Sequence, residues 1–425
     1  MAASTCPDWL RLDNAAKIFP AVDSPTFTTV FRLSATLLEP VSAPDLQRAV
    51  DDLADRFPYF RVRLGAGLFW HYLQRTDAPV VVAEERDAPC RTIDARHTRS
   101  HLFRVLCFGR KISVELSHII TDGAGGLAFL RALVGRYLEI RGLDVTDWGD
   151  VMHRGQDVDP EEFEDSYKKF FDPRIPLPPD QERAVQLAEP VEGAARIVTG
   201  ISPVAPVLEL ARSRGVSLTE LLSALYLFVL YEHVESMSPE HGRTALRPLR
   251  LVVPVNLRKL FPSRTMRNFI LHVTPGIDPR LGRFTFDEVL ARVHHTMRVE
   301  VNEKLLKQQI ARNMRGETNP VIRVTPLFVK IPVERALFRK YGTAIASGVL
   351  SNLGAASMPP PMDERIERFE FITVPNRDTR VTAGVISHRD RVYTTFASLV
   401  RSREIERRFF SRLRELGVPV KVETN

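Results

Sequence analysis

A proline-rich, acidic stretch near the middle of the chain places the strongest constraint on how it folds. From residue 144 onward the composition becomes acidic, and four prolines stand close together between Pro173 and Pro179. Proline fixes the backbone near polyproline geometry and removes an amide donor, so the stretch favours a semi-rigid connection over a core element. In a chain of 425 residues we therefore predict two units, 1–179 and 180–425, joined by this crossover.

The first unit contains patterns typical of both strands and helices. Thr26–Leu37 is rich in β-branched and aromatic residues, which predicts a strand. Leu102–Phe108 and Ile112–Ser117, separated by three residues, predict a hairpin. Helical spacing of apolar residues predicts a helix over 126–140.

The second unit shows the same mixture. Ser217 and Thr285 each stand three residues before a glutamate, and these capping signals predict the beginnings of two helices. The second of these helices is expected to reach about Arg312. A strand is predicted at Ala344–Ser351. The fold class is therefore α/β, arranged as α+β layers.

Charge and hydropathy exclude several classes of protein. No uncharged apolar run approaches the ~20 residues that a membrane-spanning helix needs, so we expect no membrane span. The net charge is +7, but the basic residues between Arg401 and Arg414 are interrupted by glutamates. That alternation is typical of a solvated helix face, so we expect no nucleic-acid partner.

Cysteine and histidine patterns give no metal site. Cys6, Cys90 and Cys107 lack metal-ligand spacing and cannot form an even disulfide framework. With no apolar export segment at the N-terminus, we expect reduced thiols and a cytoplasmic location. His294 and His295 lack a third ligand at helical spacing and are interpreted as a surface pair.

The segment from Ser117 to Gly126 (SHIITDGAGG) contains the residues best suited to chemistry. Aliphatic residues alternate with polar ones over Ile112–Ser117, and His118 has the parity of the aliphatic face. The pattern places an inward imidazole at a strand end, where it is either a general base or a satisfied core residue. Asp122 precedes a helix, where a carboxylate caps free N–H groups.

The glycines that follow also match a dinucleotide-binding fingerprint. Gly123–Ala128 fits G-x-G-x-x-A, and Asp144 lies 21 residues beyond Gly123. That fingerprint requires a second parallel strand after the helix, whereas residues 144–155 are polar. We therefore do not expect a dinucleotide cofactor.

The motif His118-x-x-x-Asp122-Gly123 resembles the HxxxDG signature of the CoA-dependent acyltransferase superfamily. That superfamily includes chloramphenicol acetyltransferase, the BAHD acyltransferases, polyketide-associated acyltransferases and condensation domains. Two further segments resemble it in order along the chain: Val255–Arg258 (VNLR), followed by an Arg-Asn pair, and Ser351–Gly354 (SNLG). The opening segments are similar to bacterial alcohol-acetyltransferase-type members, so the resemblance spans nearly the whole chain.

The resemblance implies two chloramphenicol-acetyltransferase-like lobes with the active-site channel between them. His118 is then the general base that takes a proton from a hydroxyl or amine acceptor. Ser351 and Asn352 are the candidate oxyanion donors, in a segment that otherwise reads as an ordinary strand-ending turn. Asp122 is expected to pair with Arg258 across the lobes, and Gly123 to permit a tight turn. Many members carry a second histidine where this chain has Ser117, which strand parity places on the opposite face from His118.

Three functions remain open at this point. The first is a monomeric acyltransferase that uses acyl-CoA as co-substrate, with no permanently bound cofactor and no metal. The second is a condensation-like enzyme that takes its acyl group from a carrier protein. The third is a non-catalytic binding protein on the same fold. The residues that bind the donor and the identity of the acceptor do not follow from the sequence.

Overall fold

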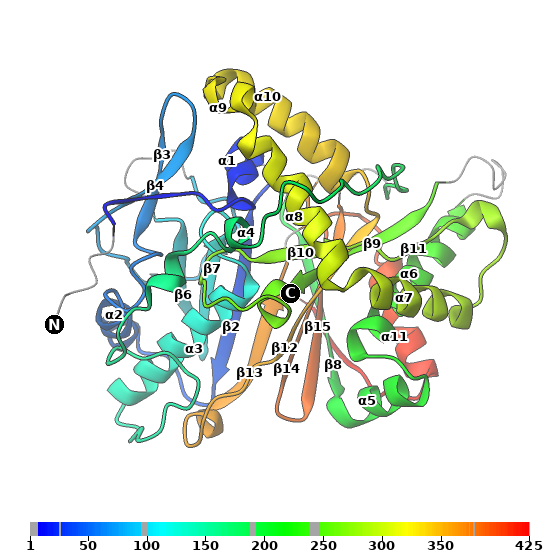
Figure 1. Ribbon diagram of the computed structural model, residues 1–425. Helices are drawn as coiled ribbons and strands as arrows, with labels where there is room; N and C mark the ends of the chain where they lie inside the picture. Colours follow the sequence, from blue (N-terminus) through cyan, green and yellow to red (C-terminus); the bar gives the residue numbers. More distant parts are fainter. Residues whose placement is uncertain are drawn as a thin grey trace.

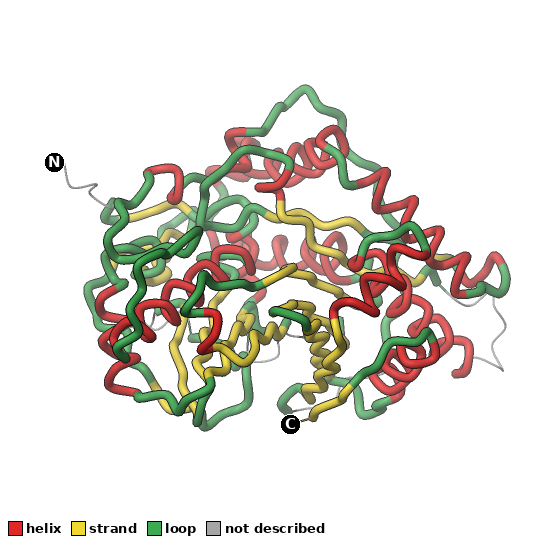
Figure 2. Tube along the Cα trace, turned by 90° about the horizontal axis from the view of Figure 1, so that it is seen from below, coloured by secondary structure: helices red, strands yellow, loops and turns green. Residues whose placement is uncertain are grey.

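The computed structural model describes residues 7–24, 27–94, 101–187, 193–237, 247–373, 375–376 and 379–424. Figure 1 shows the first part of the chain, in blue and cyan, beside a second group of helices and strands that includes the C-terminal helix. In Figure 2 helices flank the strands of the central region on both sides. The predicted mixture of strands and helices in layers is confirmed.

A five-stranded sheet forms the base of the first part, in the order β13–β2–β7–β6–β5. Its strands are β2 (Val30–Leu37), β5 (Ala83–Glu84), β6 (Phe103–Phe108), β7 (Lys111–Ser117) and β13 (Ile366–Ile372). Strands β6 and β7 are antiparallel, with Phe108 opposite Lys111, so the predicted hairpin is confirmed. Only β5 and β6 pair in parallel within this sheet.

The second sheet is larger and mixed, in the order β10–β9–β12–β14–β15–β8–β16, with β11 also on β9. Strand β12 is parallel to both its neighbours, and the other pairs are antiparallel. The strands are β8 (Arg196–Pro203), β9 (Leu249–Asn256), β10 (Ile270–Val273), β11 (Gly276–Ile277), β12 (Gly348–Ala355), β14 (Val381–His388), β15 (Arg391–Ser398) and β16 (Lys421–Thr424). A small sheet joins β1 (Trp9–Arg11), β4 (His71–Arg75) and β3 (Val62–Ala66).

The helices cover these sheets. Those of the first part are α1 (Phe19–Val22), α2 (Ala43–Asp52), α3 (Gly123–Ile140) and α4 (Ser166–Lys169). The others are α5 (Val204–Ser213), α6 (Leu218–Met237), α7 (Phe286–Glu300), α8 (Glu303–Thr318), α9 (Pro320–Val324), α10 (Leu327–Phe338) and α11 (Glu404–Glu415). Helix α6 is apolar on nearly all sides because α7 and α11 pack against it.

The sheets do not follow chain order completely. Strand β13 comes from beyond residue 360 yet pairs with β2, with Phe369 opposite Ala35 and Phe371 opposite Leu33. Both phenylalanines are buried in the core of the first sheet. The division at residue 179 stays a prediction. Strand β13 crosses it, because this strand follows residue 179 in the chain but pairs in the sheet of the first part.

Several element boundaries differ from the predictions; β2, for example, begins at Val30 within the predicted Thr26–Leu37. Helix α3 begins at Gly123 rather than at Gly126, because Asp122 caps it. The helix capped by Thr285 ends at Glu300, since Asn302 caps a new helix there. Strand β12 begins at Gly348 rather than at Ala344, because residues 339–343 extend α10 by a π-helical turn.

Candidate active site

His118 lies directly after β7, with its ring between two phenylalanines. Its backbone N–H donates to the Thr29 carbonyl at 2.9 Å. The ring centroid lies 5.5 Å from that of Phe19 and 4.7 Å from that of Phe31. The Ser117 hydroxyl instead bonds the Thr29 hydroxyl at 3.0 Å. The two aromatic rings therefore fix the plane of the half-buried imidazole.

The hydrogen bond of the His118 ring selects its tautomer. Nδ1 lies 3.2 Å from the backbone carbonyl oxygen of Thr121. A carbonyl only accepts, so Nδ1 carries the hydrogen and Nε2 keeps a lone pair in the neutral ring. Burial lowers the pKa of His118 from its ordinary value of 6.5, although nearby Asp122 acts in the opposite direction. At neutral pH the ring is therefore uncharged and able to accept a proton at Nε2.

Asp122 is buried and uses both carboxylate oxygens. Oδ1 accepts from the backbone N–H groups of Ala124 and Gly125, each at 3.1 Å, and so caps α3. Oδ2 accepts from Nη1 of Arg258 and from the backbone N–H of Phe269, both at 2.8 Å. The carboxylate thus points away from His118 and ties α3 to the second part of the chain.

Arg258 is held as firmly as its partner. It lies in a short 3-10 turn, Leu257–Lys259, after β9. Nε donates to the Thr265 carbonyl at 2.9 Å and Nη2 to the Arg267 carbonyl at 2.5 Å. The sequence resemblance led us to expect this pairing, and the structure places Asp122 and Arg258 in direct contact. Their functional role stays a prediction.

Two polar residues that were not among the predicted site residues support the backbone of His118. The amide of Asn268 donates to the His118 carbonyl at 2.8 Å and to Oδ2 of Asp13 at 3.1 Å. Asp13 also accepts from the backbone N–H of Ala16 at 2.8 Å and so holds the turn before Phe19. Burial raises the pKa of Asp13 to about 6, although Arg267 opposes this. Asn268 belongs to the Arg-Asn pair visible in the sequence, whereas nothing in the sequence marks Asp13.

The glycines after Asp122 permit close packing. A Cβ at Gly123 would lie 2.7 Å from Cδ2 of Leu353 on β12. A Cβ at Gly125 would lie 2.6 Å from the carbonyl oxygen of Met266. Real Cβ atoms do not approach so closely, so larger residues would push the second part away from α3.

Ser351 and Asn352 project to opposite faces of β12. The Asn352 amide donates to the Thr219 hydroxyl of α6 at 3.0 Å and accepts from the Gly354 N–H at 2.8 Å. Leu353, on the alternate face, points at Gly123. Side chains alternate along a regular strand, which puts Ser351 on the face of Leu353, although the register of β12 shifts between Asn352 and Ala355.

A second observation supports that orientation of Ser351. Ser351 pairs with Gly384 of β14, and a Cβ at Gly384 would lie 2.4 Å from the Phe371 carbonyl oxygen. Residues opposite each other on neighbouring strands project to the same face. Phe371 in turn contacts Phe31, whose ring lies against His118. Ser351 therefore faces the side of the sheet from which His118 is reached. Whether either residue is an oxyanion donor stays a prediction.

Comparison with family models and curated sequences gives no match, whereas comparison with solved structures does. No protein-family model and no curated protein sequence matches this chain. Polyketide synthase associated protein 5 from Mycobacterium tuberculosis is similar with a TM-score of 0.57 and 15% identity, covering 95% of this chain and 97% of that chain.

Two further solved structures belong to the same group. Trichothecene 15-O-acetyltransferase from Fusarium sporotrichioides has a TM-score of 0.59 at 10% identity, covering 97% of this chain and 96% of that chain. The starter condensation domain of rhizomide synthetase has a TM-score of 0.58 at 11% identity, covering 96% and 94%. This chain has the fold of the CoA-dependent acyltransferases and condensation domains.

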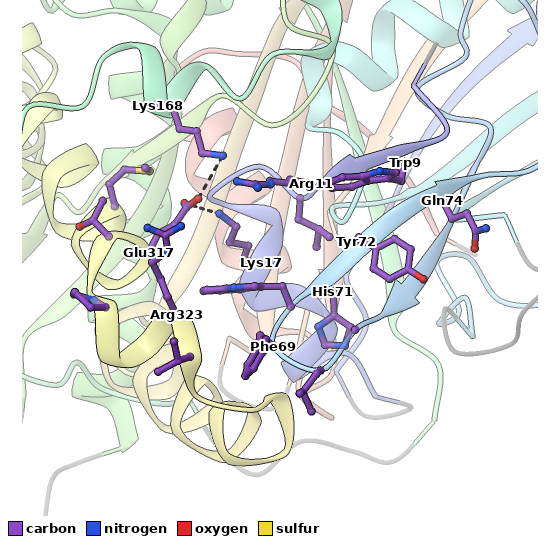
Figure 3. A pocket seen from close by; sticks show the side chains of 18 of the residues that line it. Trp9, Arg11, Lys17, Phe69, His71, Tyr72, Gln74, Lys168, Glu317 and Arg323 are labelled. Atoms are coloured by element: carbon purple, nitrogen blue, oxygen red, sulfur yellow. Dashed lines mark ion pairs between the residues drawn. The ribbon is translucent and has the colours of Figure 1, made fainter. Parts of the chain in front are cut away.

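This fold also contains a cavity of about 1300 Å³, shown in Figure 3, and His118 is not among its lining residues. Its walls come from β1, the β3–β4 hairpin, α4 and the α8–α9 pair, and they combine aromatic and charged side chains. Lys17 forms an ion pair of 2.5 Å with Glu317, which lies 3.4 Å from Lys168. Phe19, two residues after Lys17, stacks on His118. A single turn of chain therefore separates the cavity wall from the imidazole.

The remaining predicted features fit this fold without adding a second site. Nδ1 of His294 lies 3.3 Å from Oε2 of Glu220, and His295 is exposed. Cys90 and Cys107 are buried free thiols, while Cys6 lies outside the described residues. In the part of the chain that the structure describes, no cluster of three or more His, Cys, Asp or Glu residues is arranged to hold a metal ion.

The length and composition of the described helices bear on whether they could cross a membrane. Taken singly, none of the described helices is long and apolar enough to cross a membrane. Helices α5 and α6 meet the criterion of length and composition only as a pair, which is bent by 83°. Helix α6 is buried within the hydrophobic core of the larger, mixed sheet.

Proposed function

We propose that this protein transfers an acyl group from a CoA thioester to the hydroxyl or amine of a small-molecule acceptor. The proposal rests above all on the tautomer of His118, whose Nδ1 is 3.2 Å from the Thr121 carbonyl oxygen. That contact leaves Nε2 as a base, and burial keeps the ring neutral by lowering its pKa. The fold, shared with acyltransferases and condensation domains, supports the same reaction class.

The reaction needs no covalent enzyme intermediate. Nε2 of His118 takes the proton as the acceptor oxygen or nitrogen attacks the thioester carbonyl carbon. A tetrahedral intermediate forms, and its collapse breaks the carbon–sulfur bond. The same proton then passes from Nε2 to the departing thiolate, so the products are the ester or amide and free CoA.

The negative oxygen of the intermediate requires a hydrogen-bond donor. Of the two candidates, we propose Ser351, because its face of β12 is the one that carries Leu353 against Gly123. The Asn352 amide already donates to Thr219 on the other face. Asn352 is then a residue that holds the end of β12 in position.

Asp122 and Arg258 are proposed to fix the geometry rather than to take part in proton transfer. The carboxylate caps α3 and accepts from Arg258 and the Phe269 N–H, so both of its oxygens are already bonded to groups other than His118. The pair joins residues on either side of the proposed lobe boundary at 179. Loss of either partner would leave the other charge buried and uncompensated.

We propose CoA as the carrier of the acyl group. The rhizomide starter condensation domain was solved with C8-CoA and Leu-SNAC, so the fold accommodates such a thioester in that protein. In this chain Arg11 and Arg323 line the large cavity, where they suit an anionic ligand, whereas the charge of Lys17 there is already paired with Glu317. A carrier protein as the acyl source is the competing outcome of the test below.

The test measures free thiol released by purified protein with acyl-CoAs of several chain lengths and a panel of alcohols and amines. Wild type should release thiol only when an acceptor is present, and His118→Ala should not. His295→Ala, which removes an exposed imidazole, is the matched control and should retain full activity. Thermal unfolding of both variants shows whether a lost activity reflects lost fold.

Two results would overturn the proposal. Equal thiol release by wild type and His118→Ala excludes this histidine as the base. Turnover of acyl groups on a carrier protein, with none on CoA, assigns the protein to the condensation-like alternative.

A further inference from the structure

Helix α10 turns an apolar face outward. Phe328, Val333 and Leu337 are 74%, 53% and 47% exposed. Lys330 is only 4% exposed and Glu334 is half-buried, whereas Arg335 and Arg339 are exposed and Leu327 is buried. Apolar residues therefore lie on the outward as well as the inward side of α10, whereas an ordinary surface helix buries its apolar stripe.

Specific contacts hold α10 in this orientation. The ammonium of Lys330 donates to the Phe69 carbonyl at 2.8 Å and lies 3.3 Å from the centroid of the Trp70 ring. The backbone N–H of Leu327 donates to the Leu68 carbonyl at 2.9 Å. These bonds fix the side of the helix that carries Leu327 and Lys330 against the β3–β4 hairpin, so Phe328 is left outside.

Neighbouring segments extend the apolar face. Figure 1 shows α9, α10 and the tip of the β3–β4 hairpin along one edge of the molecule. Single exposed apolar residues are ordinary, but a contiguous group marks an interaction surface. We name this group the apolar edge; its main members, each between 47% and 74% exposed, are Leu68, Val321, Val324, Phe328, Val333 and Leu337.

The exposed charged residues of the segment that carries α9 and α10 are basic, although Lys340 is paired with Asp180 and Arg335 donates to the Ala21 carbonyl. The segment 320–343 contains five basic residues and one acidic residue, the half-buried Glu334. Arg323 and Arg339 are exposed, and neither has an ion pair within the described parts of the chain. Exposed apolar side chains flanked by unpaired cations match the interface of an anionic bilayer, where acyl chains lie beneath phosphate headgroups.

We propose that the apolar edge binds the surface of an anionic lipid membrane. Phe328, Val333 and Val324 enter the region below the headgroups, while Arg323 and Arg339 contact lipid phosphates. The exposed side chains lie on two helices and a hairpin tip at the rim of the molecule, which favours a lipid surface over a protein partner. This proposal stands independently of the acyl-transfer reaction.

Vesicle flotation tests the proposal. Wild-type protein is mixed with vesicles of phosphatidylcholine alone or of phosphatidylcholine with an equal amount of phosphatidylglycerol. We expect it to float with the second kind and less with the first, and the difference to shrink as salt is raised. The double variant Phe328→Ser/Val333→Ser should lower partitioning by about tenfold or more.

Matched controls come from exposed residues elsewhere. Phe108, 63% exposed at the end of β6, gives the control Phe108→Ser, which should float like wild type. Arg323→Gln/Arg339→Gln should weaken binding to anionic vesicles more than binding to neutral ones; because Arg323 also lines the large cavity, Arg339→Gln alone is the variant in which acyl transfer is compared. Arg401→Gln/Arg403→Gln removes the same net charge from another exposed surface and should have little effect.

Each alternative occupant gives a distinct result. Failure of wild type to float with either vesicle overturns the proposal. So does a dimer in sedimentation that Phe328→Ser/Val333→Ser dissociates, since the edge is then a contact between copies. Binding of an acidic acyl carrier protein that the same variant abolishes, without vesicle binding, also overturns it. His118→Ala should float like wild type, so loss of catalysis and loss of membrane binding remain distinguishable.

Discussion

Two regions join the later part of the chain to the first: the surroundings of Asp122 and Arg258, and those of α10. They differ in which side chains they leave in contact with water. Around Asp122 and Arg258, charged groups point inward and every carboxylate oxygen has a donor. Around α10, Lys330 also points inward, yet aliphatic and aromatic side chains such as Phe328 remain outside. The first region satisfies its buried charge completely within the chain, whereas the second leaves apolar surface without a partner in the chain.

The comparison separates two uses of a buried cation. The Asp122–Arg258 pair fixes one geometry beside His118, as a reaction site requires. Lys330 instead fixes which face of α10 is outward. Exposed apolar side chains such as Phe328 are unfavourable in water, and the proposed membrane contact would remove them from it.

The largest effect is expected from His118→Ala. Removal of the proposed general base should lower the rate of acyl transfer by a factor of roughly 10²–10⁴. The half-buried ring contributes packing but no ion pair, so the fold should persist. Thiol-release kinetics together with circular dichroism measure both quantities, and an active, folded variant would remove this region from the reaction.

Asp122→Ala or Arg258→Ala should destabilise the protein by about 3–5 kcal/mol, because each leaves a buried charge without its partner. Urea unfolding measures the free energy, and soluble yield should fall with it. Asp150→Ala removes a carboxylate that is 78% exposed in its pair with Arg131 and should matter much less. Stable Asp122→Ala protein with only a kinetic defect would contradict the architectural role.

Ser351→Ala and Asn352→Ala distinguish the two faces of β12. Loss of an oxyanion donor should lower kcat on the order of 10²-fold for Ser351→Ala while KM and stability stay close to wild type. Asn352→Ala should instead lower stability, because Thr219 and the Gly354 N–H lose a partner. The opposite pattern would reassign the donor to Asn352.

The pH dependence of kcat/KM should report His118. The neutral imidazole is the base, and burial lowers its pKa below 6.5, so activity should rise with pH through that lowered value and be level at neutral pH. Below the pKa the rate should fall by about tenfold per pH unit.

Asp13, whose pKa is about 6, is the control for this profile. Asp13→Asn should keep the acid limb, since Asp13 reaches His118 only through Asn268. An acid limb centred above pH 6.5 would contradict the assignment to a buried histidine.

The smallest effect is expected from Phe328→Ser. Its side chain is 74% exposed, so the free energy of unfolding should change by no more than about 0.5 kcal/mol. A large loss of stability in urea would show that the apolar edge is part of the fold, and the contrast with the Asp122 region would disappear.

Local sequence patterns predicted the helices and strands around the site. The structure differs from these predictions where the same residues fit more than one kind of element. The β6–β7 hairpin and the caps at Ser217 and Thr285 follow from turn and capping chemistry over a few residues. The break at Asn302 was missed because helical spacing continues through it. Strand β12 was placed too early, since apolar spacing over 344–347 fits either state.

The site was predictable only where a motif carried it. His118, Asp122 and Arg258 stand in segments with family resemblance, but Asp13 acts through a fold that brings it beside Asn268. Strand parity does not tell which face of β12 meets α3, so Ser351 and Asn352 remained equivalent in the sequence. Contacts of Leu353 and Asn352 distinguish them.

The sequence by itself determined the mixed elements, the strand end that displays His118 and the capping role of Asp122, because each depends on neighbours within a few residues. Only the tertiary structure decided three other features: the exchange of β13 into the first sheet, the hydrogen bond network behind His118, and the orientation of α10. Each depends on partners more than a hundred residues away, and Lys330 on the Trp70 hairpin is the clearest case. Periodicity shows that a helix has two faces, while packing decides which of them is inward.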